Sequence, residues 1–251
     1  MNNILLRNAI KKHCQKPKKI EYFIINGAEC EPYITSDTRT MMDNVEDMEV
    51  ALDMIEEYLN VDKVIIAVES NKRKAISNMK KLAAKKKNRS VSVLPAIYPQ
   101  GGEKVLIYHT VGRIVEERCL PIDVGCVVCN CTTIAAIGKY IKTGMPLVEK
   151  CITVDGGAIK EPKNVMAPIG APIIDVLEFA GVDIDNVAKV LFGGPMMGIT
   201  IYTDELPMVK NNNAMLAFGA AQAKVHEETD CIRCGRCVRA CPMSLMPAAI
   251  E

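Results

Sequence analysis

Short apolar runs alternate with longer amphipathic stretches over the first half of the chain. Residues 37–59 carry apolar side chains at spacings of three and four, with Asp37 as a candidate N-cap, and residues 71–86 form a lysine-rich amphipathic stretch. Both patterns predict helices. The apolar, β-rich runs predict buried strands; they are residues 20–26 (IEYFIIN), 63–68 (KVIIAV) and 91–94. Strands that alternate with helices in this way predict an α/β fold with a parallel sheet.

The pattern changes near residue 147. Before it, residues 121–130 form a further apolar run and residues 132–142 a further helical stretch, so we expect the α/β unit to span residues 1–146. After it, short β runs are interrupted by Gly and Pro, which predicts a small α+β module over residues 147–210. Its expected elements are strands near 148–154, 163–168 and 188–192 and a helix near 172–180. The alanine-rich residues 213–226 predict a helix at the start of a third unit, residues 211–251.

Composition and charge narrow the functional classes. The chain has 251 residues, and 31 basic against 30 acidic side chains give a net charge of +1, whereas nucleic-acid-binding domains are usually strongly basic. No apolar run reaches the roughly 18–20 residues that span a bilayer, and residues 1–19 place their charges after a short apolar patch, opposite to a secretory signal. We therefore expect a cytoplasmic protein that binds no nucleic acid. Its 11 cysteines should stay reduced and serve metal binding or redox chemistry.

Four cysteines near the C-terminus carry the most specific chemical signal. Cys231, Cys234, Cys237 and Cys241 follow the spacing C-x2-C-x2-C-x3-C. In bacterial ferredoxins with this spacing, three thiolates hold one [4Fe–4S] cluster and the fourth ligates the other cluster. We predict a [4Fe–4S] site; the alternative metal, zinc, usually binds two C-x2-C pairs that a longer insert separates. No cysteine follows Cys241, so either an upstream cysteine completes the cluster or, as we favour, the chain stops before a second motif.

Three further cysteines, Cys126, Cys129 and Cys131, lie close together in the first unit. One hypothesis gives them a redox or metal-binding role. The other, which we favour, is that they are buried and inert, because a free cysteine packs as a small hydrophobic side chain.

Five motifs are distributed over most of the chain. They are residues 26–32 (NGAECEP), 98–104 (YPQGGEK), 125–137 (GCVVCNCTTIAAI), 193–198 (GGPMMG) and 231–247 (CIRCGRCVRACPMSLMP). In order and rough spacing they resemble the RnfC subunit of the Rnf electron-transport complex and, more distantly, the flavin-carrying subunit of NADH:quinone oxidoreductases. The resemblance implies an α/β flavin domain, then a β-grasp (SLBB-type) module, then a helical ferredoxin-like iron–sulfur segment. It implies an electron-transfer subunit that takes a hydride from NADH onto FMN and passes single electrons to [4Fe–4S] clusters.

The resemblance also implies which residues contact the flavin. Asn26 and Glu31 would line the flavin, and Tyr98 would stack near a ring. Asn130 and Thr133 would hold the phosphate end, where the start of a helix offers free N–H groups. The 193–198 motif is interpreted as a structural turn.

On the nicotinamide side, the resemblance implies two acidic catalytic residues, Glu29 and Glu103. The implied partners are NADH, ferredoxin and the other subunits of an Rnf-like membrane complex, on whose cytoplasmic face the chain would lie peripherally. Two alternatives remain: a soluble electron donor of the proline-reductase or cobalamin-reductase type, and a flavin-free iron–sulfur docking protein.

The sequence departs from the family at both ends. The family carries a glycine-rich flavin-phosphate loop before the NGAECEP motif, whereas residues 1–25 contain no glycine. Only ten residues follow Cys241. We therefore expect a chain truncated at both ends that binds FMN weakly or not at all in isolation.

Overall fold

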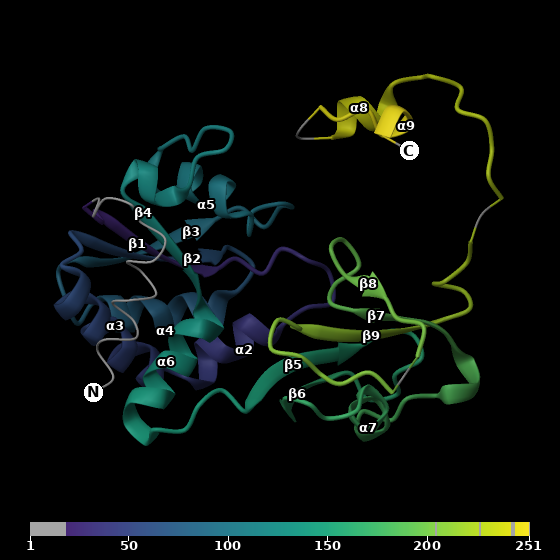
Figure 1. The fold of residues 1–251 in the computed structure, drawn as a ribbon, viewed down its shortest axis with the longest axis horizontal. Helices are drawn as coiled ribbons and strands as arrows, with labels where there is room; N and C mark the ends of the chain where they lie inside the picture. The colour runs from purple at the N-terminus through teal and green to yellow at the C-terminus, as the bar shows by residue number, and fades with distance from the viewer. Residues whose placement is uncertain (1–18, 204, 226, 242–243, 251) are drawn as a thin grey trace.

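The computed structural model describes residues 19–203, 205–225, 227–241 and 244–250. Figure 1 shows two sheet-centred units side by side and a C-terminal segment that lies apart from both, at the end of an extended stretch. The elements of the first unit are β1 (Tyr22–Gly27), α2 (Ser36–Asp43), α3 (Val45–Leu59), β2 (Lys63–Glu69), α4 (Arg73–Ala83), β3 (Arg89–Leu94), α5 (Glu103–Val111), the 3-10 helix η1 (Pro121–Val124), β4 (Cys126–Asn130) and α6 (Cys131–Thr143). Those of the rest are β5 (Glu149–Asp155), β6 (Lys163–Pro168), α7 (Ile173–Phe179), the 3-10 helix η2 (Ile184–Asn186), β7 (Val187–Phe192), β8 (Ile199–Thr200), β9 (Ala214–Gly219), α8 (Arg236–Ala240) and α9 (Pro247–Ile250).

The first unit is a four-stranded parallel sheet with helices on both faces. The strand order is β3-β2-β1-β4, and every pair is parallel, which confirms the predicted α/β core. Successive side chains of a strand point to opposite faces: Phe23 and Ile25 pack under α2, α3, α4 and α6, whereas Ile24 packs under α5. Because both faces are covered, β1 and β2 are apolar nearly throughout, as parallel strands usually are.

Two predicted elements of the first unit differ in detail. The helix predicted over residues 37–59 is two helices, which meet at Asn44. Asp37 lies in the first turn of α2 rather than at its N-cap, which is Thr35. The apolar run 121–130 forms η1 followed by β4, separated at Gly125, which adopts a left-handed backbone conformation.

The second unit is a five-stranded mixed sheet of order β6-β5-β9-β7-β8. Strand β9 is parallel to β5 and antiparallel to β7. Helix α7 packs on one face, against side chains that include Met215 and Ala217 of β9. The opposite face, which includes Leu216 and Phe218, is covered by Ile34 from the first unit.

The helix predicted over residues 213–226 is therefore wrong, because residues 214–219 form β9, the central strand of this sheet. All six residues of β9 are buried, so the strand has no polar alternation and resembles an apolar helix segment in sequence. A boundary at residue 211 would separate β9 from its own sheet. We propose instead that the second unit ends after Gly219.

Short contacts join the two sheet units. The backbone N–H of Thr35, just before α2, donates to Oγ1 of Thr153 in β5 at 2.9 Å, and the rings of Tyr33 and Phe218 lie 5.6 Å apart between centroids. In the described part of the chain, no helix has the length and apolar composition needed to cross a bilayer.

Candidate functional site

The carboxyl ends of β1 and β4 lie side by side at the carboxyl-terminal edge of the first sheet, at the point where the strand order reverses. From β1 the chain continues to β2 on one side, while β4 pairs with β1 on the other. Open parallel sheets bind ligands at such a switch point. Three segments reach this edge: the loop after β1, the loop of residues 95–102 before α5, and the start of α6.

Asn26, the next-to-last residue of β1, ties two of these loops together. Its Nδ2 donates to the carbonyl oxygen of Gly101 at 3.0 Å, and its Oδ1 accepts the backbone N–H of Ala28 at 3.1 Å. A Cβ at Gly101 would lie 2.8 Å from the carbonyl oxygen of Ala28. The close approach of the two loops therefore requires glycine at position 101.

Glu29 is buried, with 7% of its surface exposed, and its carboxylate anchors the start of α2. It accepts the backbone N–H of Asp37 at 2.7 Å and that of Thr38 at 3.2 Å, and the Thr38 hydroxyl at 2.6 Å. Lys72 Nζ lies 3.4 Å away. Burial, and next the charge of Asp37, raise the pKa of Glu29. These contacts give the Glu29 carboxylate a structural role at the start of α2, and the catalytic role that the resemblance implied stays a prediction.

Glu31 contacts the second unit. Its Oε2 accepts the backbone N–H groups of Met196 and Met197 at 2.9 and 3.3 Å, both in the turn of residues 193–198 between β7 and β8. A Cβ at Gly194 would lie 2.0 Å from the same oxygen. The 193–198 turn thus has a structural role, as the sequence predicted, and it fits closely around Glu31.

Asn130 is the N-cap of α6 and belongs to a polar network. Its Oδ1 accepts the N–H of Thr132 at 2.8 Å, and its Nδ2 donates to Asp37 at 2.8 Å. The Thr132 hydroxyl donates to the other carboxylate oxygen of Asp37 at 2.7 Å. Asp37 is 5% exposed. The network joins the starts of α2 and α6, and sequence reasoning did not assign two of its members, Asp37 and Thr132, to the site.

Three predicted site residues remain exposed. Thr133 lies in the first turn of α6, Glu103 is the first residue of α5, and Tyr98 lies in the preceding loop with 40% of its surface exposed. The first N–H groups of a helix have no partners within the helix. Thr133 and Glu103 are therefore at helix starts that a ligand can reach.

Four cysteines of the sheet units, Cys126, Cys129, Cys131 and Cys151, have raised pKa values. Burial raises the pKa of Cys129 to about 11 and that of Cys151 to about 11, and raises the pKa of Cys131 well above its usual value. A reactive cysteine needs a lowered pKa. Burial also raises the pKa of Cys126. The raised pKa values favour the hypothesis that Cys126, Cys129 and Cys131 are inert thiols.

The four C-terminal cysteines lie on the segment that carries α8. Cys231, Cys234 and Cys237 are exposed, and Cys241 is half-buried. Within residues 19–203, 205–225, 227–241 and 244–250, no three His, Cys, Asp or Glu side chains are gathered closely enough to hold a metal ion. The donor set nevertheless fits an iron–sulfur cluster, because four thiols at ferredoxin spacing lie on one exposed segment.

Family models match each part of the chain. The model of the Nuo51 FMN-binding domain matches residues 7–139, more than half of the chain, the SLBB domain model matches residues 151–200, and the 4Fe–4S binding domain model matches residues 224–244. The chain belongs to the Nuo51 FMN-binding domain family. The order of a Nuo51-type flavin domain, an SLBB module and an iron–sulfur segment confirms the architecture that the resemblance implied.

Curated relatives of this Nuo51-family chain are RnfC subunits. It is 42% identical over 234 residues to the RnfC-type subunit of the proton-translocating ferredoxin:NAD(+) oxidoreductase complex of Clostridium ljungdahlii, covering 93% of this chain and 51% of that protein. It is 38% identical over 233 residues to the corresponding subunit of the Na(+)-translocating ferredoxin:NAD(+) oxidoreductase complex of Acetobacterium woodii, covering 93% and 53%. The predicted resemblance to RnfC is confirmed. The chain spans about half the length of the curated relatives it matches.

Among solved structures, the Nuo51-family chain resembles an NAD+-reducing [NiFe]-hydrogenase in the H2-reduced and air-oxidized states. The TM-scores are 0.63 and 0.65 at 18% and 17% identity, over 80% and 82% of this chain and 41% of each matched chain. At this identity the similarity concerns the fold alone.

The predicted flavin and nicotinamide residues thus form two groups. One group holds the loops of the sheet edge together through its own side chains: Asn26, Glu29, Glu31 and Asn130. The other group is exposed and available to a ligand: Tyr98, Glu103 and Thr133. Sequence reasoning missed the partners of the first group, among them Asp37, Thr38 and Lys72. In the sequence, the only sign that Asp37 and Thr38 belong to the site is their position shortly after the NGAECEP motif.

Proposed function

We propose that this chain forms the electron-transfer core of an RnfC-type subunit, which takes a hydride from NADH onto FMN and passes single electrons to [4Fe–4S] clusters. The observation that carries the proposal is the combination of two sites on one chain. A Nuo51-type sheet presents an accessible helix start at its switch point, and an exposed segment carries four cysteines at ferredoxin spacing. Bound FMN would supply the conversion between the two electrons of NADH and the single electrons of a cluster.

The phosphate of FMN would bind at the start of α6. Helix N-termini bind phosphate through free N–H groups and the helix dipole. The buried carboxylate of Asp37 lies against Asn130 and Thr132 and would repel a phosphate there. We therefore assign the phosphate to the exposed side of the helix start, next to Thr133.

The loop of residues 95–102 would form another wall of the flavin site. Asn26 holds this loop through the carbonyl oxygen of Gly101, and glycine at 101 leaves no side chain between the loop and β1. Tyr98 offers an exposed ring in this loop, and Glu103 opens α5 just after it. In this arrangement Asn26 is a positioning residue, whereas Tyr98 and Glu103 are the side chains that reach the ligands.

Cys231, Cys234 and Cys237 would hold a [4Fe–4S] cluster, and Cys241 would ligate a second cluster. Ferredoxin and other subunits of an Rnf-type complex would be the protein partners, with the chain peripheral on the cytoplasmic face of the membrane. Recovery of the protein only in the soluble fraction, with no complex subunits attached, would favour the soluble electron-donor alternative.

Anaerobic reconstitution with iron, sulfide and saturating FMN tests the electron path. We expect NADH to bleach the flavin absorbance and then to produce the EPR signal of a reduced cluster. Cys234→Ser should remove the EPR signal and leave flavin bleaching intact, whereas Glu103→Gln should slow the bleaching. Stoichiometric zinc in place of iron, or bound FMN that NADH does not reduce, would contradict the proposal; a protein with a cluster but no flavin binding would support a docking role.

The phosphate position has its own test. Thr133→Asp adds a negative charge at the start of α6 and should weaken FMN binding about fivefold or more, measured by flavin fluorescence. Riboflavin, which lacks the phosphate, should bind equally well to both proteins. Thr143→Asp, at the other end of the same helix, is the matched control. Equal loss of FMN and riboflavin would exclude a phosphate next to Thr133.

A further inference from the structure

The C-terminal segment that carries the four cysteines also carries a local excess of positive charge. Residues 231–250 contain three basic side chains, Arg233, Arg236 and Arg239, and no acidic one. The chain as a whole is nearly neutral, with a net charge of +1. The positive charge of this segment is therefore not a property of the whole chain.

Each of the three arginines lies beside a cysteine of the motif. Arg233 directly precedes Cys234, and Arg236 directly precedes Cys237. Arg239 follows Cys237 by two residues. Because consecutive Cα atoms are about 3.8 Å apart, the connectivity of the chain alone keeps these side chains next to the motif. Exposed charges closer than a Debye length, about 8–10 Å, still interact in salt solution.

The backbone and one arginine side chain fold back onto the motif. The backbone N–H of Arg233 donates to Sγ of Cys231 at 3.4 Å. A Cβ at Gly235 would lie 3.4 Å from Nη1 of Arg239. The guanidinium of Arg239 therefore lies against the loop of residues 234–237, which joins two of the cysteines.

No ion pair neutralises these charges among the residues that the structure describes. The three arginines are exposed, and none of the ion pairs in those residues involves them. The nearest acidic residues in the sequence are Glu227, Glu228 and Asp230, which precede the motif. A guanidinium stays protonated throughout the ordinary pH range, so the three positive charges are constant.

These charges act on the redox equilibrium of a cluster in a defined direction. A cluster held by thiolates is negatively charged, and reduction adds one electron and thus one further negative charge. A nearby positive charge attracts the reduced form more strongly than the oxidised form. Net charge and hydrogen bonds to sulfur are among the factors that set the reduction potential of iron–sulfur clusters. Arginine side chains and N–H groups beside the thiolates should therefore raise this potential.

On the basis of the proposed function, we propose that Arg233, Arg236 and Arg239 raise the reduction potential of the [4Fe–4S] cluster and so favour its reduction by one electron. The guanidinium groups keep their protons, so the electron is the only charge that moves. The three residues act through their charge and are not ligands of iron.

A redox titration followed by EPR measures the midpoint potential of the reconstituted full chain. Dithionite and soluble mediators supply the electrons, so the measurement depends on neither NADH nor FMN. Each of Arg233→Gln, Arg236→Gln and Arg239→Gln should lower the equilibrium constant for reduction about twofold, as expected for one charge at about 9 Å in water. At about 59 mV per tenfold, this is a shift of about 18 mV, and the triple variant should shift by about 53 mV.

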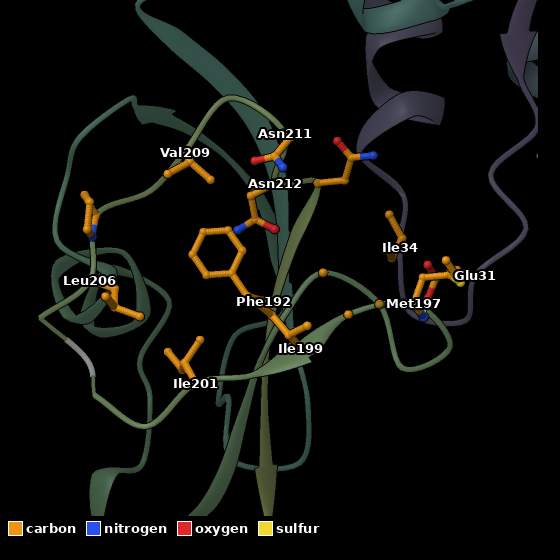
Figure 2. Close-up of a pocket in the computed structure, with 15 residues that line it drawn as sticks. Glu31, Ile34, Phe192, Met197, Ile199, Ile201, Leu206, Val209, Asn211 and Asn212 are labelled. Carbon is orange, nitrogen blue, oxygen red and sulfur yellow. Dashed lines mark hydrogen bonds between the residues drawn. The ribbon is translucent and has the colours of Figure 1, made fainter. Parts of the chain in front are cut away.

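Further variants separate charge from shape. Arg239→Lys keeps the charge and should keep the potential near that of the wild type, whereas a role of the planar guanidinium against Gly235 would be lost in both variants of Arg239. Arg118→Gln, whose side chain is 93% exposed in the first unit, is the matched control for the loss of a charge. Ala240→Lys, at an exposed position on α8, should raise the potential by about as much as one arginine does. Asn211→Lys adds the same charge at an exposed position of the second unit (Figure 2) and should leave the potential unchanged.

Salt supplies a last test, because the Debye length falls to about 3 Å in about 1 M salt. The difference between the wild type and the triple variant should shrink there. The proposal is overturned if the triple variant keeps its iron content and has an unchanged or higher potential, or if Arg239→Lys lies as low as Arg239→Gln. Where the arginine variants fail to hold a cluster, Ala240→Lys against Asn211→Lys decides the matter. A wild-type chain that holds no cluster would contradict the proposed function together with this proposal.

Discussion

Replacing Gly138 by alanine tests the packing of α6 on α3, where local propensity and tertiary contacts predict opposite results. Alanine in the interior of a helix is more stable than glycine by about 1 kcal/mol. In the folded protein, however, a Cβ at position 138 would lie 1.7 Å from the carbonyl oxygen of Asp47 and 2.5 Å from its carbonyl carbon. Both atoms belong to the backbone of α3, so no side-chain rotation relieves the contact.

The magnitude follows from what must move. A tolerable contact starts near 3.0 Å, so α6 and α3 would have to separate by roughly 1.3 Å at this point. Helix α3 is fixed to the sheet by fully buried side chains, among them Met48 and Leu52, and separation would open that core. Overpacking costs about 1–3 kcal/mol, occasionally more. A contact of 1.7 Å with backbone atoms lies at the top of that range, so after subtracting the gain of about 1 kcal/mol in helix propensity we expect a net loss of about 2 kcal/mol, or about 4–8 °C in Tm for a chain of this size.

Urea unfolding of the wild type and Gly138→Ala, followed by circular dichroism, measures this difference. Gly157→Ala is the comparison: its Cβ would meet the side-chain end of the exposed Gln222 at 2.1 Å, and that side chain can rotate away at the cost of the exposed hydrogen bond that it accepts from the N–H of Gly157. We expect this variant to lose about 1 kcal/mol or less. A Gly138→Ala protein as stable as the wild type, or more stable, would show that helix propensity outweighs the packing of α6 on α3.

Three further predictions concern charged side chains. Because burial raises the pKa of Glu29 above its ordinary value of 4.5, its contribution to stability is present below that value and is lost as the pH rises through the raised pKa; Glu29→Gln should remove this part of the pH dependence in urea titrations between acid and neutral pH, and an unchanged pH profile would refute it. Arg89→Ala should cost about 2 kcal/mol in the same assay, because the Arg89 side chain is 0% exposed and its removal breaks the 2.7 Å ion pair with the nearly buried carboxylate of Glu56, which keeps only the Lys86 ammonium at 2.9 Å as an ion-pair partner; a loss below about 1 kcal/mol would mean that the pair is solvated. Glu31→Ala should speed hydrogen exchange of the amides in the 193–198 turn roughly tenfold, and unchanged exchange would show that the turn holds its shape without Glu31.

The strands of the first sheet could be predicted because local and tertiary signals agree there. Residues 20–26 and 63–68 are apolar, short and bounded by polar residues, and burial on both faces of a parallel sheet requires that pattern. At residues 214–219 the local signal points the wrong way, because the alanines favour a helix and only the pairing of β9 with β5 and β7 makes this run a strand. The break between α2 and α3 at Asn44 leaves no sequence signal, because the apolar spacing continues across it.

Glu29 and Glu103 show why the site was only partly predictable. Both are glutamates in motifs that resemble the same family, and nothing in the letters distinguishes them. What distinguishes them is contacts with distant residues: Glu29 is enclosed by Thr38 and Lys72, which are 9 and 43 residues away, whereas Glu103 is exposed at the start of α5. Replacing a buried carboxylate that accepts several hydrogen bonds changes the stability of the folded state. Replacing an exposed carboxylate changes the binding or reaction of the ligand that it contacts. The two substitutions should therefore separate, with Glu29→Gln changing the pH dependence of unfolding and Glu103→Gln changing the rate at which NADH reduces the flavin at unchanged stability.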